Sequence, residues 1–231
     1  MKAVIISDIH GNSEALRSLP ESFDELWVLG DLVNYGPDPG DVVEFVQSKA
    51  ALAVRGNHDH AVGFGEDPRC SAPFREMAEA MMRYTCSVLS GRQREFLRSL
   101  PMTSGRRTAG VRVQLCHATP SDPLFAYCGP DSPRWEQEVE AAGADILLVG
   151  HTHVPFVRRF GKRQVVNPGS LGQPKTGRPA ACYAVWEDGE IELRSFEYPF
   201  DETIRKIYAL PIEEKIRAGL SEVLRNGGCR A

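Results

Sequence analysis

The chain has 231 residues, of which 42% are hydrophobic and 25% charged, and its formal net charge is −4 at pH 7. This composition is typical of a soluble globular protein and excludes disordered, collagen-like and coiled-coil chains. The small negative charge gives no overall electrostatic footprint for nucleic acid or for an anionic membrane. A chain of this length forms one large domain or two small ones. Because it contains no repeat or linker, we expect one domain over residues 1–231.

Apolar runs alternate with helical stretches in the first third of the chain. The runs are short and bounded by turn residues, which predicts strands at residues 2–7, 25–29 and 51–54. Helices are expected at 14–19 and 42–49, where Ser13 and Asp41 stand at the N-cap positions. This order predicts parallel strands, with the chemistry in the loops at their carboxyl ends.

The amino-terminal apolar stretch is interrupted by Asp8, before it reaches the ~7–15 residues of a signal peptide. No uncharged apolar run approaches the ~20 residues that cross a bilayer. The six cysteines form no Cys-x-x-Cys pair, which favours free thiols in a reducing compartment. These features predict a cytoplasmic protein.

A stretch rich in Gly and Pro at 61–72 interrupts the alternation. Beyond it, apolar residues recur at helical spacing from Phe74 to Val88, and 92–99 predicts a second, more basic helix. We therefore expect a helical insert at about 61–105. A methionine stripe at this spacing is more often core than a substrate lid, so packing is the favoured role and a lid is the alternative.

The remainder of the chain returns to strands, which are expected at 111–116, 145–149, 154–160, 163–167, 181–187 and 190–197. Several of them alternate with period two and are joined by short turns, so the second half is expected to be more antiparallel. Helices are predicted at 133–142 and at about 211–225.

Polar motifs follow five of these strands. They are Asp8-Ile9-His10, Gly30-Asp31, Gly56-Asn57-His58-Asp59, His117 and Gly150-His151-Thr152-His153. Period-two alternation points Asp8 and His10 to one side, and it does the same for His151 and His153. A lone histidine is more often a core or surface residue than a ligand. Five motifs at strand ends, all with side chains that can bind a metal, nevertheless predict a shared metal site. His60 belongs to none of these positions and is assigned to a loop.

In order and approximate spacing, these motifs resemble those of the calcineurin-like metallophosphoesterases, and the small bacterial and archaeal phosphodiesterase branch is the most similar. The resemblance extends to Asn167-Pro168-Gly169-Ser170 and to the stretch from Gly30 to Pro39, and it covers residues 1–185. It implies an α/β fold, a four-layer α-β-β-α sandwich of two mixed sheets, with a dinuclear metal site at the carboxyl ends of the strands.

Carried over residue by residue, the resemblance also implies the metal ligands. One ion would take Asp8, His10, Asp31 and His153, and the other would take Asp31, Asn57, His117 and His151. A carboxylate can bridge two cations, so Asp31 suits the shared position, and the single amide oxygen of Asn57 suits one ion. Nitrogen and oxygen ligands without thiolate favour two divalent transition-metal ions (Mn, Fe, Ni, Co or Zn) over Ca²⁺.

Two such ions, ~3.5–4 Å apart, would activate a bridging hydroxide for in-line attack on phosphorus without a covalent enzyme intermediate. His58 would act as general acid toward the leaving oxygen, and Asp59 would hold its ring in the productive tautomer. The alternative for His58 is a further ligand or a partner of one. Asn167 and Gly169 either offer contacts near the site or form a structural turn.

The expected function is metal-dependent hydrolysis of small phosphodiesters or nucleotides. The alternative of a Ser/Thr protein phosphatase is weakened because the arginine that this subgroup carries after the second-strand aspartate is absent from 32–36. Arg55, Lys175 or Arg178 would have to replace it, and a surface or structural role is favoured for each.

A catalytically silent scaffold for protein partners is a further alternative, disfavoured because His58 and every expected ligand are present. Long nucleic acids are disfavoured by the acidic balance, and no membrane partner is expected. The physiological substrate, the native metal and a homo-oligomeric state stay open.

Overall fold

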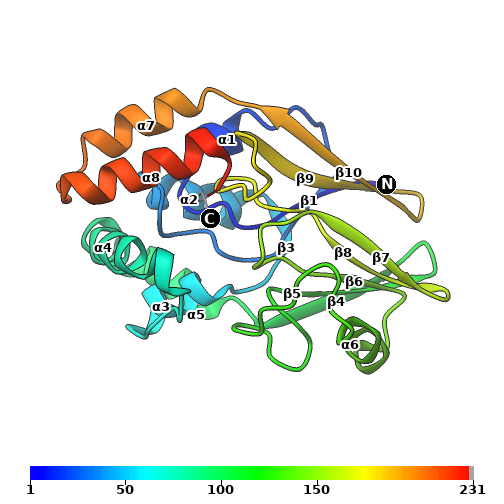
Figure 1. Cartoon of the computed structure of the whole chain (residues 1–231). Coiled ribbons are helices and arrows are strands. Elements are labelled where there is room, and N and C mark those ends of the chain that lie inside the picture. Colours follow the sequence, from blue (N-terminus) through cyan, green and yellow to red (C-terminus); the bar gives the residue numbers. More distant parts are fainter. Residues whose placement is uncertain (229–231) are drawn as a thin grey trace.

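The computed structural model describes residues 1–228 and contains two five-stranded sheets that face each other (Figure 1). The first sheet has the order β10-β9-β1-β2-β3 and consists of β1 Lys2–Ile6, β2 Glu25–Val28, β3 Ala50–Ala53, β9 Ala180–Glu187 and β10 Glu190–Glu197. The second has the order β4-β5-β6-β8-β7 and consists of β4 Thr103–Thr108, β5 Val111–Cys116, β6 Ile146–Leu148, β7 Phe156–Phe160 and β8 Arg163–Asn167.

Each sheet has three parallel strands at one side or in its centre, β1-β2-β3 in the first and β5-β6-β8 in the second, and antiparallel neighbours beside them. Both sheets are therefore mixed, as predicted. The second half is more antiparallel than the first, as expected, although its strands β5, β6 and β8 run parallel to one another. Between β5 and β6, the helix α6 Trp135–Ala142 returns the chain to the starting end of the sheet, so that the next strand runs parallel.

Helices cover the outer faces of both sheets, and a shared core lies between the sheets. In β1, Ala3 and Ile5 face the second sheet, whereas Val4 and Ile6 face the helices. Strands buried on both faces read as continuous apolar runs, and this is why β1 could be recognised. Trp27 and Trp186 pack in the shared core with ring centroids 5.9 Å apart. Full burial of a large apolar side chain of this kind stabilises the fold by about 1.5–3 kcal/mol.

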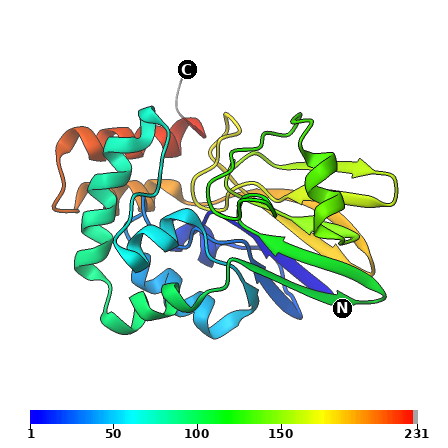
Figure 2. The same ribbon diagram turned by 90° about the horizontal axis from the view of Figure 1, so that it is seen from below.

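Seven helices other than α6 complete the described part of the chain: α1 Ser13–Arg17, α2 Pro39–Lys49, α3 Asn57–Phe64, α4 Ala72–Val88, α5 Gly91–Ser99, α7 Phe200–Tyr208 and α8 Glu214–Asn226. Leu16, Val42 and Leu97 pack α1, α2 and α5 onto the first sheet. Trp135 packs α6 onto the second. Together with the two sheets, these helices form the predicted four layers, and Figure 2 shows α4, α7 and α8 on the same side of the molecule.

Several local predictions are wrong. Asn12, not Ser13, caps α1, and its side chain accepts a hydrogen bond from the Ala15 amide. Asp38 occupies the N-cap position of α2, and Asp41 lies in its first turn. His60 lies inside α3 rather than in a loop.

Three elements within residues 1–228 were not predicted, the edge strand β4 and the helices α3 and α7. β4 is an edge strand with the sequence TSGRRT, so it needs no apolar run to be stable. The helices α4, α7 and α8 share one apolar cluster that includes Met81, Ile204 and Leu220, which supports packing as the role of the methionine stripe.

The described cysteines are free thiols, and Cys229 lies outside the described residues. Within residues 1–228, the helices fall short of the length and apolarity that a membrane crossing requires.

Candidate metal centre

The polar motifs converge where the parallel strands of the two sheets end. The first sheet contributes Asp8 and His10 after β1, Asp31 after β2 and Asn57 after β3, and the second contributes His117 after β5 and His151 and His153 after β6. Two groups of side chains in this set have the spacing of a metal site, and they are Asp8, His10 and His153, and Asp31, His117 and His151. Each group draws on both sheets.

Left-handed backbone conformations, not strand alternation, point these side chains together. β1 ends at Ile6 and β6 at Leu148, so the period-two argument does not reach the motifs that follow them. Positive φ angles occur instead at Asp8 (53°), His10 (48°), Asp31 (53°), His151 (66°) and His153 (63°). Such a conformation costs a non-glycine residue about 1–2 kcal/mol, and residues held in it cluster at functional sites.

Two motif glycines are required because the chain segments approach each other closely. A Cβ atom on Gly56 would lie 2.0 Å from Asp31 Oδ1, and one on Gly150 would lie 2.0 Å from Ser7 Oγ and 2.9 Å from Asp8 Oδ2. Any side chain at these positions would displace a carboxylate of the centre.

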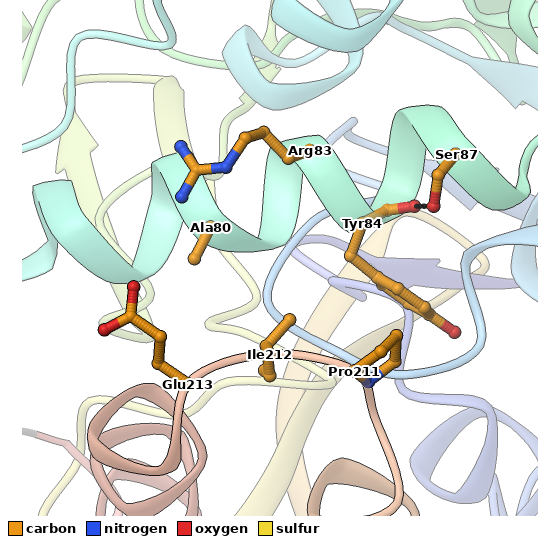
Figure 3. Close-up of a pocket in the computed structure, with 7 residues that line it drawn as sticks. All are labelled: Ala80, Arg83, Tyr84, Ser87, Pro211, Ile212 and Glu213. Carbon is orange, nitrogen blue, oxygen red and sulfur yellow. Dashed lines mark hydrogen bonds between the residues drawn. The ribbon is translucent and has the colours of Figure 1, made fainter.

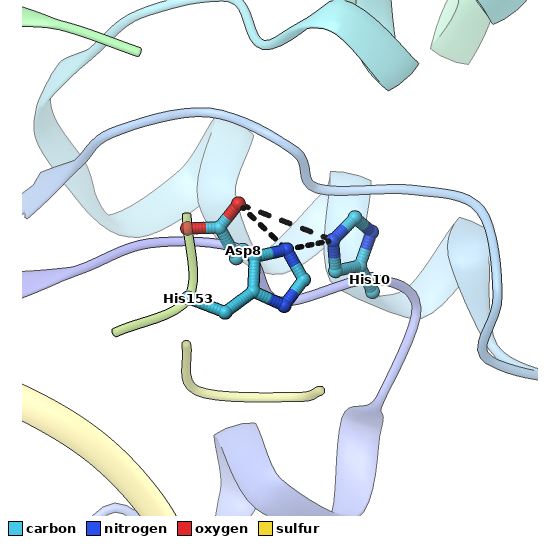
Figure 4. A group of neighbouring side chains, drawn as sticks. All are labelled: Asp8, His10 and His153. Atoms are coloured by element: carbon cyan, nitrogen blue, oxygen red, sulfur yellow. Dashed lines mark hydrogen bonds and ion pairs between the residues drawn. The ribbon is translucent and has the colours of Figure 1, made fainter. Parts of the chain in front are cut away.

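In the first group, unprotonated nitrogen atoms face each other (Figure 4). The Nδ1 atoms of His10 and His153 lie 3.1 Å from Val33 O and 2.6 Å from Gln173 O. Since a carbonyl oxygen only accepts hydrogen bonds, both Nδ1 atoms carry the proton, and the Nε2 lone pairs oppose each other at 3.2 Å. Asp8 Oδ1 lies 3.4 Å from His153 Nε2 and is buried without a hydrogen-bond partner. A cation between these atoms would satisfy all three.

In the second group, too, nitrogen and oxygen atoms that can bind a metal lie close together. His117 Nδ1 lies 2.7 Å from Leu29 O, which leaves Nε2 to face Asp31 Oδ2 at 3.2 Å, Asn57 Oδ1 at 3.1 Å and His151 Nδ1 at 3.2 Å. The Asn57 amide nitrogen donates to Pro68 O at 2.7 Å, and this fixes the amide oxygen toward the group.

Asp31 lies between the two groups. Its Oδ1 accepts a hydrogen bond from the backbone N–H of His58, and its Oδ2 lies 3.2 Å from His117 Nε2 and 3.8 Å from His10 Nε2. A single oxygen, Oδ2, therefore faces both groups, whereas the sequence argument relied on two carboxylate oxygens.

Burial and mutual charge perturb the protonation of the whole cluster. Burial raises the pKa of Asp8 to about 7, and it lowers the pKa of His10 to about 4 and that of His151 to about 3. Burial also opposes ionisation of Asp31 and protonation of His117. Their mutual attraction outweighs it, so the pKa of Asp31 falls well below its ordinary value and that of His117 rises to about 9. In a metal-free cluster a proton on His117 thus supplies part of the missing positive charge.

The donor set fits divalent transition metals. It consists of imidazole nitrogens, carboxylate oxygens and one amide oxygen, and neither group of described residues contains a cysteine. Carbonyl oxygens hold the outer nitrogens of His10, His117 and His153, which is how proteins orient histidine ligands.

His58 lies beside the centre, but its recorded partners differ from the predicted one. Its Nδ1 is 2.7 Å from the side-chain nitrogen of Asn34, and its Nε2 is 3.5 Å from Cys70 Sγ. The Asp59 carboxylate instead accepts hydrogen bonds from the backbone N–H groups of Leu32, Val33 and Gly56. The prediction that Asp59 orients the His58 ring is therefore wrong. Asp59 fixes the loops that carry Asp31 and Asn57.

Asn34 selects the tautomer of His58. Its side-chain nitrogen also donates to Ala78 O, and its oxygen accepts from the Tyr35 N–H, which sets the orientation of the amide. His58 Nδ1 is then an acceptor, and the ring proton sits on Nε2, the nitrogen nearer to the cavity residue Cys70. Burial lowers the pKa of His58 to about 3, so the ring is neutral at pH 7 in the absence of a ligand.

Asn167 and Gly169 form a turn that supports the centre. The Asn167 amide donates to Gly150 O at 2.7 Å and to Thr152 Oγ1 at 3.1 Å, and its oxygen accepts from the Gly169 N–H. The turn therefore holds the loop that carries His151 and His153, in agreement with the structural interpretation.

A cavity of about 230 Å³ opens over the two groups. Beyond the predicted site residues, its wall includes Arg69, Phe74, Phe125, Tyr127 and Lys175. Only Lys175 had been considered from the sequence, with a surface or structural role favoured for it. No motif marks the others, because they lie in irregular segments and at the first turn of α4.

Two other cations considered as phosphate ligands have structural contacts. Arg55 is 8% exposed and donates to Arg98 O at 2.8 Å. The backbone of Arg178 meets Gly227 so closely that a Cβ there would lie 2.1 Å from Arg178 O. The structural role favoured for each agrees with these contacts.

A larger hollow of about 570 Å³ lies elsewhere, between α4 and the loop that joins α7 to α8 (Figure 3). Its lining includes Arg83, Tyr84 and Glu213, and none of the proposed ligands is part of it. The chemistry is therefore expected in the smaller cavity.

Comparison with known proteins identifies the superfamily to which this chain belongs. The sequence model of the calcineurin-like phosphoesterase superfamily domain matches residues 1–188, and the chain belongs to this superfamily. Phosphodiesterase YfcE of Escherichia coli K12 is 31% identical over 199 residues, which cover 78% of this chain and 85% of that protein. An uncharacterized protein of Methanocaldococcus jannaschii is 30% identical over 241 residues, which cover 95% and 96% of the two chains.

A solved structure supports the same assignment. A metallophosphoesterase from Sphaerobacter thermophilus superposes with a TM-score of 0.81 at 28% identity, over 96% of this chain and 99% of that one. The match spans the whole architecture, including the carboxyl-terminal helices that follow the family domain.

Proposed function

We propose that this protein hydrolyses small phosphodiesters or nucleotides with two divalent transition-metal ions bound at the strand ends. The observation that carries the proposal is the convergence of atoms that can only accept hydrogen bonds, with His10 Nε2 and His153 Nε2 opposed at 3.2 Å beside the unpartnered Oδ1 of Asp8. Superfamily membership and the similarity to a phosphodiesterase over 78% of the chain agree with it.

The ligand assignment follows the two groups. Asp8, His10 and His153 would hold one ion, His117, His151 and Asn57 would hold the other, and Asp31 would contact both through Oδ2. Such ions, when bound, acidify a water molecule and neutralise charge on the phosphoryl oxygens.

The protein groups around the ions would manage the leaving oxygen. Water adds its oxygen to phosphorus, the bond from phosphorus to the leaving oxygen breaks, and that oxygen requires a proton. His58 presents Nε2–H toward the cavity and would donate to this oxygen as hydrogen-bond donor and general acid. Donation as an acid requires the fully protonated ring, in which Nδ1 also carries a proton, so the Asn34 amide would then exchange its present contacts with His58, Ala78 and Tyr35. A bound phosphoester anion favours this charged form.

A substrate panel across metals tests the proposal. Protein stripped with a chelator is assayed on bis(p-nitrophenyl) phosphate, p-nitrophenyl phosphate, nucleotides and a phosphopeptide, alone and with Mn²⁺, Ni²⁺, Co²⁺ or Zn²⁺. We expect diester or nucleotide hydrolysis only with added metal. Preference for the phosphopeptide would instead indicate a protein phosphatase, and metal-loaded protein inactive on every ester would indicate a scaffold.

We also propose a cytoplasmic location, in which a reducing environment keeps the described cysteines as thiols. After denaturation, all of them are expected to react with a thiol reagent in protein isolated under non-reducing conditions.

A further inference from the structure

Two pairs of a cation and an aromatic ring line the cavity over the metal centre. The guanidinium carbon of Arg69 lies 4.1 Å from the ring centroid of Phe125, and Nζ of Lys175 lies 4.7 Å from that of Phe74. All four side chains belong to the cavity wall, and none is a proposed metal ligand. Contact of this kind attracts a cation to the face of the ring.

The positive charge here exceeds what hydrolysis of a simple diester requires. Two divalent ions carry more charge than the carboxylates of Asp8 and Asp31 cancel, so the centre alone can neutralise the single negative charge of a phosphodiester. Arg69 and Lys175 lie in the wall of the same cavity as His58, His151 and His153, so their positive charges add to that of ions bound there. Arg69 and Lys175 therefore favour a substrate with additional negative charge.

The mouth of the cavity also exposes an aromatic surface. Tyr127 is 65% exposed, and its ring centroid lies 5.8 Å from that of His151. An exposed aromatic ring beside a charged cavity offers a flat face on which the base of a nucleotide can stack.

From these contacts we propose that the cavity binds a nucleoside polyphosphate, with Arg69 and Lys175 holding a phosphoryl group beyond the one that is attacked and Tyr127 stacking on the base. This inference rests on the proposed function and specifies its substrate. The reaction adds water across a phosphoanhydride, so that one P–O bond forms, one bridging P–O bond breaks, and the leaving phosphate oxygen takes a proton.

The loop that carries Lys175 depends on the carboxyl-terminal helices. Gly177 N donates to Gly227 O at 2.8 Å, directly after α8. The family domain ends at residue 188, so α8 lies outside it. The segment after α8 thus helps to hold the loop that carries Lys175, although Lys175 itself lies within the family domain.

The test compares nucleotide binding to metal-free protein by calorimetry. Wild-type protein is expected to bind ADP about tenfold more tightly than AMP, because the second phosphate gains a charge-assisted contact. Arg69→Gln and Lys175→Met should each remove most of this preference. The matched controls Arg159→Gln and Lys162→Met alter exposed cations on the β7–β8 hairpin and should retain it.

The aromatic contact is tested separately. Tyr127→Ser should weaken ADP binding several-fold and leave the binding of inorganic pyrophosphate unchanged, whereas Tyr208→Ser, at an exposed tyrosine of α7, should change neither.

Hydrolysis of bis(p-nitrophenyl) phosphate by wild-type protein and by the Arg159→Gln and Lys162→Met controls separates this inference from the proposed function. We expect these controls to retain the metal-dependent kcat/KM of wild type to within about threefold. Equal binding of ADP and AMP by wild type, absence of ADP binding, or an unchanged ADP preference in both cation variants would each overturn the inference. Loss of metal-dependent diester hydrolysis in wild type would overturn the proposed function instead.

Discussion

At the scale of single residues, backbone strain and chemistry coincide in this protein. Five proposed ligands adopt positive φ, including Asp8, Asp31 and His151. Aspartate, asparagine and histidine enter this region more readily than most residues, so the side chains that suit a metal also suit these turns. The strain persists because the surrounding loops are fixed, for example by the Asp59 carboxylate on three backbone N–H groups.

His58→Ala tests the separation of acid and ligand roles. We expect kcat to fall about 10²- to 10⁴-fold, as for loss of a general acid, while elemental analysis still finds two ions per chain. His60→Ala is the matched control, because His60 contacts Glu66 rather than the centre and its loss should leave kcat nearly unchanged. Loss of an ion from His58→Ala would identify His58 as a ligand.

Gly150→Ala tests the close approach of the β6 loop to Asp8. The added Cβ would overlap Ser7 Oγ, so we expect destabilisation by about 1–3 kcal/mol, together with loss of metal. Urea unfolding and elemental analysis measure the two effects. Gly129→Ala, where the new Cβ meets nothing within 4 Å, should leave both unchanged, and wild-type metal content in Gly150→Ala would contradict the argument.

At the scale of elements, an ionic network ties the amino-terminal strand to the far edge of its sheet. Glu21 contacts Lys2 at the start of β1, Tyr183 in β9 and Arg194 in β10. Hydrogen bonds from Lys2, Arg194 and Tyr183 lower the pKa of Glu21 to about 2 from its ordinary value of 4.5. A carboxylate with a depressed pKa stabilises the folded state at higher pH.

Glu21→Gln should accordingly lower Tm at pH 6, and the difference from wild type should shrink as pH falls from 4.5 toward 2, where the carboxylate protonates. Thermal unfolding between pH 2 and 7 measures this trend. Glu192→Gln, which removes the exposed partner of Arg194, should have a smaller effect. A difference in Tm that stays constant with pH would mean that the charge of Glu21 is unimportant.

Elements with a periodic apolar pattern were the predictable ones. β5 and α4 each bury a face that repeats along the chain, and β1 is a continuous apolar run because both of its faces are buried, so their sequences reveal them. β4 lies at a sheet edge and alternates only between partly buried and exposed residues, and it was missed. The helix α3 was also missed, because Asn57 and His58 in its first turn suit the site rather than a helix.

At the scale of the whole molecule, the motif residues could be placed from sequence because parallel strands end together and each motif follows a strand. The residues of the cavity wall, in contrast, could not be predicted from the sequence. Arg69, Phe125 and Lys175 come from three segments without a pattern, and only the packing of both sheets and α8 brings them together. Strand alternation predicts that Asp8 and His10 point to one side, and the positive φ angles of both residues bring them together instead.

Metal binding should stabilise the entire fold, because each ligand group joins both sheets. A metal concentration 100 times the dissociation constant adds about 2.7 kcal/mol per site, which corresponds to an increase in Tm of about 5–10 °C. Calorimetry of chelator-treated and metal-loaded protein measures this increase. His117→Ala should show a smaller one, and an equal Tm with and without metal would contradict the proposed ligand set.

The placement of ligands on both sheets also has a consequence in the cell. If the ions bind as proposed, they close the seam between the two halves of the sandwich, so a chain deprived of metal unfolds more often and is more exposed to proteases. Scarcity of the metal would then reduce the abundance of this protein as well as its activity. The cellular metal supply would thus set how many enzyme molecules survive.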